Sequence, residues 1–70
     1  MANRYTAIIK KEGNWWIGWV EEVPGVNCQE RTKKELLESL RATLLEALQY
    51  SREEAIKAAA PEYTEVELVV

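Results

Sequence analysis

A chain of 70 residues with one cysteine and no histidine is long enough for one small domain, and it has no internal disulfide to stabilise that domain. The same composition excludes a usual zinc site, which is built from several Cys and His ligands. The net charge of −3 at pH 7 disfavours tight binding to nucleic acid, because such binding depends on neutralising phosphates. We therefore expect oligomerisation or a partner protein to supply additional stability.

The composition also indicates a cellular setting. A lone cysteine and the lack of a secretory signal pattern favour a reducing, cytoplasmic environment. No apolar run in the sequence approaches the roughly 20 residues that a membrane-spanning helix needs. We expect a cytoplasmic protein that does not insert into a membrane.

Three strands are predicted in the first half of the chain. The first covers residues 4–11 and joins the second through a tight turn, in which Gly13 can accept a positive φ. The second covers residues 15–23, is rich in aromatic and β-branched residues, and ends in a Pro-Gly turn of type II. The third is shorter and covers residues 26–31.

The second predicted strand is apolar on both faces. Alternation assigns its side chains to two sets: Trp15, Ile17 and Trp19 on one face, and Trp16, Gly18 and Val20 on the other. A single helix covers only one face, so the other needs a second copy of the chain, a partner protein or a nearby loop. Tryptophan fills cores and is also frequent at interface hot spots. We expect at least one tryptophan in each role.

A helix is predicted to begin at Thr32, because the Thr-x-x-Glu spacing to Glu35 is that of a capping box. The apolar stripe of this helix contains Leu36, Leu37, Leu40, Thr43, Leu44, Ala47 and Leu48. Leu45 lies off the stripe, where it is either incidentally exposed or part of an interface.

The last third of the chain contains a second capping-box spacing, which begins at Ser51. It predicts a bend followed by a short helix over residues 52–59, with a single helix over residues 33–59 as the alternative. Residues 63–70 are rich in β-branched side chains and predict a last strand. Three apolar residues share one face of that strand: Val66, Leu68 and Val70.

These elements predict that residues 1–70 form one α+β domain with the order β-β-β-α-(α)-β. The first three strands form an antiparallel meander, and the leucine stripe of the helix covers one face of the sheet in a second layer. We place the last strand beside the first strand and parallel to it.

Three motifs follow one another along the chain: Tyr5-Thr6-Ala7-Ile8-Ile9, then Glu22-Val23-Pro24-Gly25 after an aromatic-rich strand, then Thr32-Lys33-Lys34-Glu35-Leu36. In this order and spacing they resemble the HicB-like antitoxin family, and the resemblance spans residues 5–70. It implies a fold like a truncated ribonuclease H, with the strand order 3-2-1-4 and the helix on one face. Position 21 departs from the family pattern, because it is Glu where the family often has Pro.

The resemblance also implies a function. Antitoxins of this family bind and neutralise a HicA-like toxin, a small basic ribonuclease that cleaves messenger RNA, as part of a type II toxin–antitoxin system. The implied partners of this chain are such a toxin and further copies of the chain in a homo-oligomer. Family members that regulate transcription carry an additional DNA-binding domain after the last strand, which this sequence does not contain, so we expect no direct DNA binding.

The likeness to ribonuclease H raises the question of catalysis. That chemistry needs clustered carboxylates that hold two metal ions, including one in the middle of the first strand, and that position carries no carboxylate here. Glu21 and Glu22 point to opposite faces at a strand end, and Cys28 has no histidine to activate it. We therefore predict no catalytic residue, no cofactor and no metal site.

Three functions remain as alternatives after these exclusions. The chain is an antitoxin that binds a toxin nuclease, a solitary homo-oligomer, or a small nucleic-acid-binding module that stacks bases on exposed tryptophan. The candidate surface for a partner or for self-association comprises Trp15, Ile17, Trp19 and Leu45.

Overall fold

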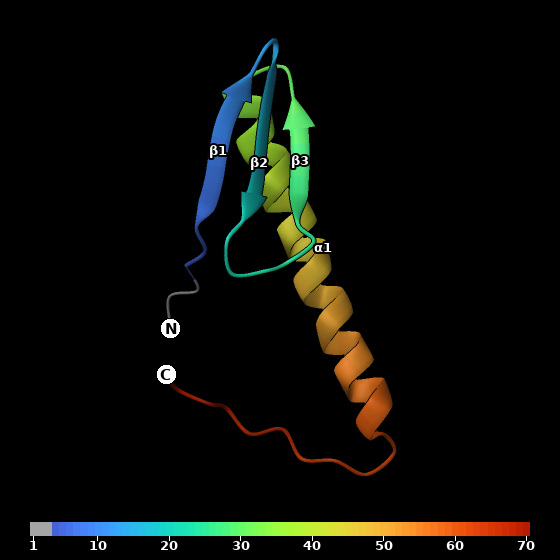
Figure 1. Ribbon diagram of the computed structural model, residues 1–70. Coiled ribbons are helices and arrows are strands. Elements are labelled where there is room, and N and C mark those ends of the chain that lie inside the picture. Colours follow the sequence, from blue (N-terminus) through green and yellow to red (C-terminus); the bar gives the residue numbers. More distant parts are fainter. Residues whose placement is uncertain (1–3) are drawn as a thin grey trace.

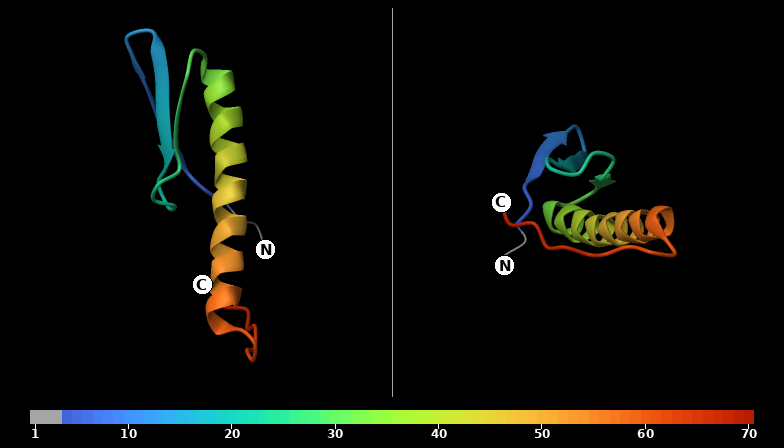
Figure 2. Two further views of the ribbon diagram at one scale, coloured as in Figure 1. Left: turned by 90° about the vertical axis from the view of Figure 1, so that its right-hand side faces the viewer. Right: turned by 90° about the horizontal axis from the view of Figure 1, so that it is seen from below.

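The computed structural model describes residues 4–70, which form three strands followed by one long helix (Figure 1). The strands are β1 (Ala7–Glu12), β2 (Trp15–Val20) and β3 (Asn27–Glu30), and the helix is α1 (Lys33–Ala59). The strands form an antiparallel sheet in the order β1-β2-β3, and α1 packs against one side of it (Figure 2). The predicted α+β class and the predicted antiparallel meander are confirmed.

Turn chemistry explains how the three strands are joined. Only residues 13 and 14 separate β1 from β2, so Glu12 lies opposite Trp15, and Gly13 adopts the positive φ of 59° that the turn requires. In the Pro-Gly turn, Gly25 has a φ of 91° and the amide of Val26 donates to the carbonyl of Val23 at 3.4 Å. Both predicted turns are confirmed.

The strands are shorter than predicted. Residues 4–6 precede β1, residues 21–23 follow β2, and β3 lacks residues 26 and 31 of the predicted range. Thr6 is nevertheless held against the end of β2, because its carbonyl accepts from the amide of Glu21 at 2.9 Å and its amide donates to Glu22 Oε1 at 2.7 Å.

The helix begins as predicted but does not bend. Thr32 caps it, with its Oγ1 accepting from the amide of Glu35 at 3.1 Å. The predicted bend at Ser51 is wrong, and the alternative of one helix over residues 33–59 is correct. No Gly or Pro interrupts this range, and Gln49 Nε2 donates to Glu53 Oε1 at 2.8 Å across the predicted break. A capping-box spacing alone therefore does not end a helix whose backbone ladder is continuous.

The predicted last strand over residues 63–70 is not formed, and this segment lies outside any helix or strand. The unbroken helix explains why. Its 27 residues extend about 40 Å, whereas the six-residue strands extend about 20 Å. The segment therefore starts well beyond the end of the sheet, where it has no edge to pair with (Figure 1).

The core lies between the sheet and the first half of α1. Its buried side chains are those of Val20, Val26, Leu36 and Leu40, and six half-buried residues pack around them: Ile9, Trp16, Val23, Cys28, Leu44 and Ala47. The second half of α1 projects past the sheet (Figure 2). In the part of the chain that the structure describes, no helix has the length and hydropathy needed to span a membrane.

Candidate protein-interaction surface

The two faces of β2 have different surroundings. Val20 and Gly18 are buried beneath α1, and Trp16 packs against the core on the same side. On the opposite side, the exposed fractions of Trp15 and Trp19 are 36% and 41%. Trp16 therefore has the expected core position, and Trp15 and Trp19 are exposed on the other side, while the expected interface role of a tryptophan stays a prediction.

The register of the sheet shows which residues accompany the exposed tryptophans. Ile8 of β1 lies opposite Trp19, and Lys10 lies opposite Ile17. Because paired residues point to the same side of a sheet, Ile8, Trp15, Ile17 and Trp19 form one apolar surface, which we call the outer face. Ile8 and Ile17 are half-buried there.

Charged groups border the outer face. The guanidinium carbon of Arg31 lies 4.1 Å from the centre of the Trp15 ring, which is the geometry of a cation–π contact. Lys10 Nζ and Glu12 Oε2 form an exposed ion pair at 3.4 Å. The Arg31 side chain therefore covers one face of the Trp15 ring.

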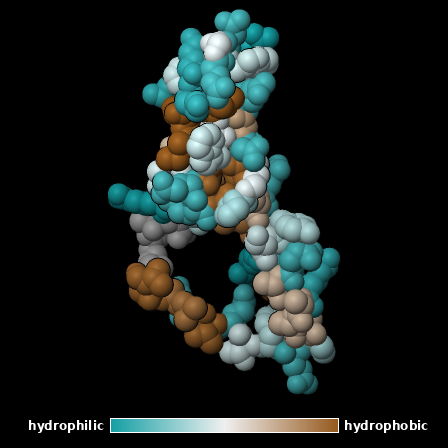
Figure 3. Space-filling view, viewed as in Figure 1, coloured by the Kyte–Doolittle hydropathy of each residue, from teal (hydrophilic) through white to brown (hydrophobic). Residues whose placement is uncertain are grey.

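Figure 3 shows hydrophobic residues gathered over the middle of the sheet and hydrophilic residues around them. An apolar centre with a polar rim is the usual arrangement of a protein interface, and exposed tryptophan supplies much of the binding energy at such interfaces. The outer face therefore has the composition of such an interface.

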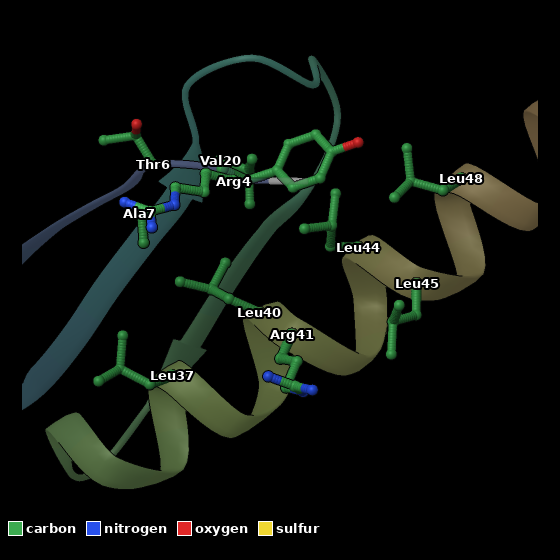
Figure 4. A pocket seen from close by; sticks show the side chains of 11 residues that line it. Arg4, Thr6, Ala7, Val20, Leu37, Leu40, Arg41, Leu44, Leu45 and Leu48 are labelled. Atoms are coloured by element: carbon green, nitrogen blue, oxygen red, sulfur yellow. The ribbon is translucent and has the colours of Figure 1, made fainter. Parts of the chain in front are cut away.

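A groove of about 570 Å³ lies on the other side of the molecule, between the start of β1 and α1 (Figure 4). We call it the α1 groove. Its walls are mainly apolar, with two arginines among the lining residues: Arg4, Tyr5, Thr6, Ala7, Val20, Leu37, Leu40, Arg41, Leu44, Leu45 and Leu48. Leu40, Leu44 and Leu48 point from the helix toward the strands in Figure 4.

The Glu22 carboxylate, which lies near the start of β1, has a lowered pKa. The hydrogen bond that Glu22 accepts from the backbone amide of Thr6 lowers the pKa of Glu22 below its ordinary value. The carboxylate is fully exposed, and the contact joins Thr6, which lines the α1 groove, to the residues that follow β2.

Residues with metal-binding or nucleophilic chemistry are scattered. Within residues 4–70, no three His, Cys, Asp or Glu side chains come together to hold a metal ion. The Cys28 thiol is half-buried with its Sγ 3.5 Å from Thr43 Oγ1, a neighbour that cannot act as a strong base.

The structure brings together three of the four predicted surface residues. Trp15, Ile17 and Trp19 share the outer face, whereas Leu45 lies on α1, has an exposed fraction of 58%, and lines the α1 groove instead. Two residues at the outer face, Ile8 and Arg31, were not predicted from the sequence. Ile8 was within reach of prediction, because a two-residue turn at positions 13 and 14 already places it opposite Trp19.

Comparisons of this chain with protein-family models, with curated proteins and with solved structures found no match.

Proposed function

We propose that this chain is a HicB-like antitoxin that binds a small, basic, messenger-RNA-cleaving toxin of the HicA type and blocks it without catalysis. The observation that carries the proposal is the outer face, where Trp15 and Trp19 are exposed on a sheet surface that the chain's own helix does not cover. The ordered family motifs described above supply the identity of the partner, and the net charge of −3 is complementary to a basic protein.

The proposal includes the strand order 3-2-1-4 of a truncated ribonuclease H fold. Strands β3, β2 and β1 already lie in that order. The fourth position is the edge of β1 above the α1 groove, where a strand with an apolar face would cover Leu40, Leu44 and Leu48. The leucines that line the groove are suited to contact the apolar face of such a strand.

The proposal is tested by purifying tagged chain from its native cells and identifying what accompanies it. We expect a basic protein of similar size that cleaves RNA when separated and is inhibited when the chain is added back. Trp19→Ala removes the largest exposed anchor of the outer face and should weaken binding by at least tenfold, as expected for an interface hot spot (~1.4 kcal/mol or more).

Tyr50→Ala is the matched control, because Tyr50 is an exposed aromatic residue on α1, away from the outer face. It should leave toxin binding unchanged. Recovery of the chain alone, or equal loss of binding in Trp19→Ala and Tyr50→Ala, would contradict the proposal.

One observation favours a second candidate function, the binding of single-stranded RNA. Trp15 stacks on Arg31, and Lys10 lies on the same face, so the outer face combines aromatic rings with cations. Titration of tryptophan fluorescence with single-stranded RNA at low salt distinguishes the two. A change that disappears at high salt supports RNA binding, and a constant signal excludes it.

A further inference from the structure

Two apolar surfaces of residues 4–70 are left exposed in the single chain. The first is the α1 groove, walled by leucines of the helix on one side and by the start of β1 on the other. The second is the segment of residues 66–70, in which Val66 has an exposed fraction of 74% and Leu68 one of 82%. Figure 3 shows this segment as a hydrophobic strip that is separated from the sheet by an opening.

The edge of β1 beside the groove is ready to accept a strand. The backbone groups of Thr6 are directed toward β2, where they bond to Glu21 and Glu22. Because these directions alternate along an antiparallel strand, the N–H and C=O groups of Ala7 and Ile9 are directed to the opposite edge. Within residues 4–70 no strand pairs with that edge.

The segment fits the groove in its pattern. Val66, Leu68 and Val70 lie at alternate positions, so a strand would present all three to one side. Glu65, Glu67 and Val69 would face the other side, away from the helix. An apolar strand face thus meets the helix leucines, and Arg4, which lines the groove from the β1 side, has a charge opposite to that of Glu67.

In the single chain, residues 65–70 do not line the α1 groove. The beginning of this segment is held to the projecting end of α1, where Arg52 Nη1 and Glu65 Oε1 form an ion pair at 3.3 Å. Tyr63 and Thr64 line a small hollow with Ile56 and Ala59 at this end of the helix. The residues that follow separate from α1 and return toward the side of the molecule where β1 begins, but they form no strand there (Figure 1).

We propose that the α1 groove binds residues 65–70 of a second copy of this chain. The incoming segment pairs with the outer edge of β1 as the fourth strand of the sheet, with Val66 and Leu68 against the helix leucines. Two copies exchange their segments reciprocally, so the same contact forms twice about a two-fold axis. This inference does not depend on the identity of the toxin, because the outer face takes no part in it.

Cross-linking between two differently labelled chains tests the exchange. Both carry Cys28→Ala; one also carries Leu48→Cys in the groove and the other Leu68→Cys in the segment. A short bifunctional thiol reagent should join them into a species of twice the 8.1 kDa chain mass that contains one copy of each. Glu46→Cys, on the helix but outside the groove, replaces Leu48→Cys in the control and should give at least tenfold less product.

The double variant Leu48→Cys with Leu68→Cys shows whether a chain fills its own groove. Cross-linking mainly within one chain, or no cross-linking between chains in the mixture, overturns the proposal.

Light scattering provides an independent measurement on chains without a reagent. Wild type should have twice the single-chain mass, and Val66→Asp with Leu68→Asp should have the single-chain mass with an unchanged circular dichroism spectrum. Both residues are exposed in the single chain, so their loss does not unfold it. Trp19→Ala should remain a dimer, which separates this contact from the toxin contact. A monomeric wild type, or a double variant that stays dimeric, overturns the proposal.

Discussion

The two faces of β2 are almost equally apolar, yet only one of them is covered. Trp16, Gly18 and Val20 face α1, whereas Trp15 and Trp19 face outward beside half-buried Ile8. Among residues 4–70, the one helix covers the inner side, and no second element covers the outer side. Apolar side chains therefore stabilise the fold on one face and are exposed on the other.

The difference between the faces is one of close approach as well as exposure. A Cβ atom at Gly18 would lie 2.9 Å from both the Ile8 carbonyl oxygen and Ile9 Cγ2 of β1, and 3.2 Å from Leu36 Cδ2 of α1, so the strand and the helix both approach β2 closely where glycine leaves room. The outer face has no such constraint. Four substitutions, in order of decreasing effect, test this contrast.

Leu36→Ala should have the largest effect, because Leu36 is fully buried against the inner face. Loss of a buried leucine side chain costs about 2 to 5 kcal/mol, which is comparable to the whole stability that a core of this size supplies. Urea unfolding followed by circular dichroism should show a mainly unfolded chain. Leu37→Ala, one residue along and 42% exposed, is the control and should cost less than about 1 kcal/mol.

The tryptophan pair compares the two faces directly. Trp16→Ala removes a half-buried ring from the core and should lower the free energy of unfolding by about 2 to 3 kcal/mol, somewhat less than for a fully buried tryptophan. Trp19→Ala should lower it by less, about 1 kcal/mol, because 41% of this residue is exposed and its side chain has less contact to lose in the single chain. Both are measured by urea unfolding at low protein concentration. Equal losses would contradict the division into core and outer faces.

Gly18→Ala tests how tightly the inner face is packed around this residue. The added methyl group would meet the backbone carbonyl of Ile8 in β1, which cannot rotate away, and the side chains of Ile9 and Leu36, so a strand or the helix must shift. Overpacking of this kind costs about 1 to 3 kcal/mol, and thermal unfolding should report it. An unchanged midpoint would mean that the inner face is not tightly packed.

The smallest effect is expected at Glu22, beside the α1 groove. Its pKa is lowered in the folded chain by the Thr6 amide, so the carboxylate stabilises the fold above the ordinary value of 4.5, and this contribution is lost as pH falls through the lowered value. Glu22→Gln should therefore flatten the decrease in stability below pH 4.5, measured by urea unfolding at several pH values. Glu21→Gln is the control and should retain the decrease.

Local chemistry made much of the fold predictable. The Gly13 turn, the Pro-Gly turn and the Thr32 cap each depend on a few neighbouring residues, and each forms as expected. The bend at Ser51 was expected from equally local evidence and does not form, because a capping motif has no effect where the preceding residues are already helical.

The candidate surface was predictable only in part. Alternation alone placed Trp15, Ile17 and Trp19 on a common face. Which face of β2 would be covered depended on the path of α1, and the separation of Leu45 from these residues depended on the position of the helix beneath the sheet.

The sequence by itself determined where the chain turns, where the helix starts and which side chains share a face, because these follow from backbone preferences over a few residues. Only the tertiary structure decided which tryptophan is inside and where the segment of residues 63–70 lies. A strand needs an edge to bond to and an apolar face needs a surface to cover it, and both depend on elements far apart in the chain. The unbroken α1 carries the start of that segment beyond the sheet, so no strand of the described residues pairs with the outer edge of β1.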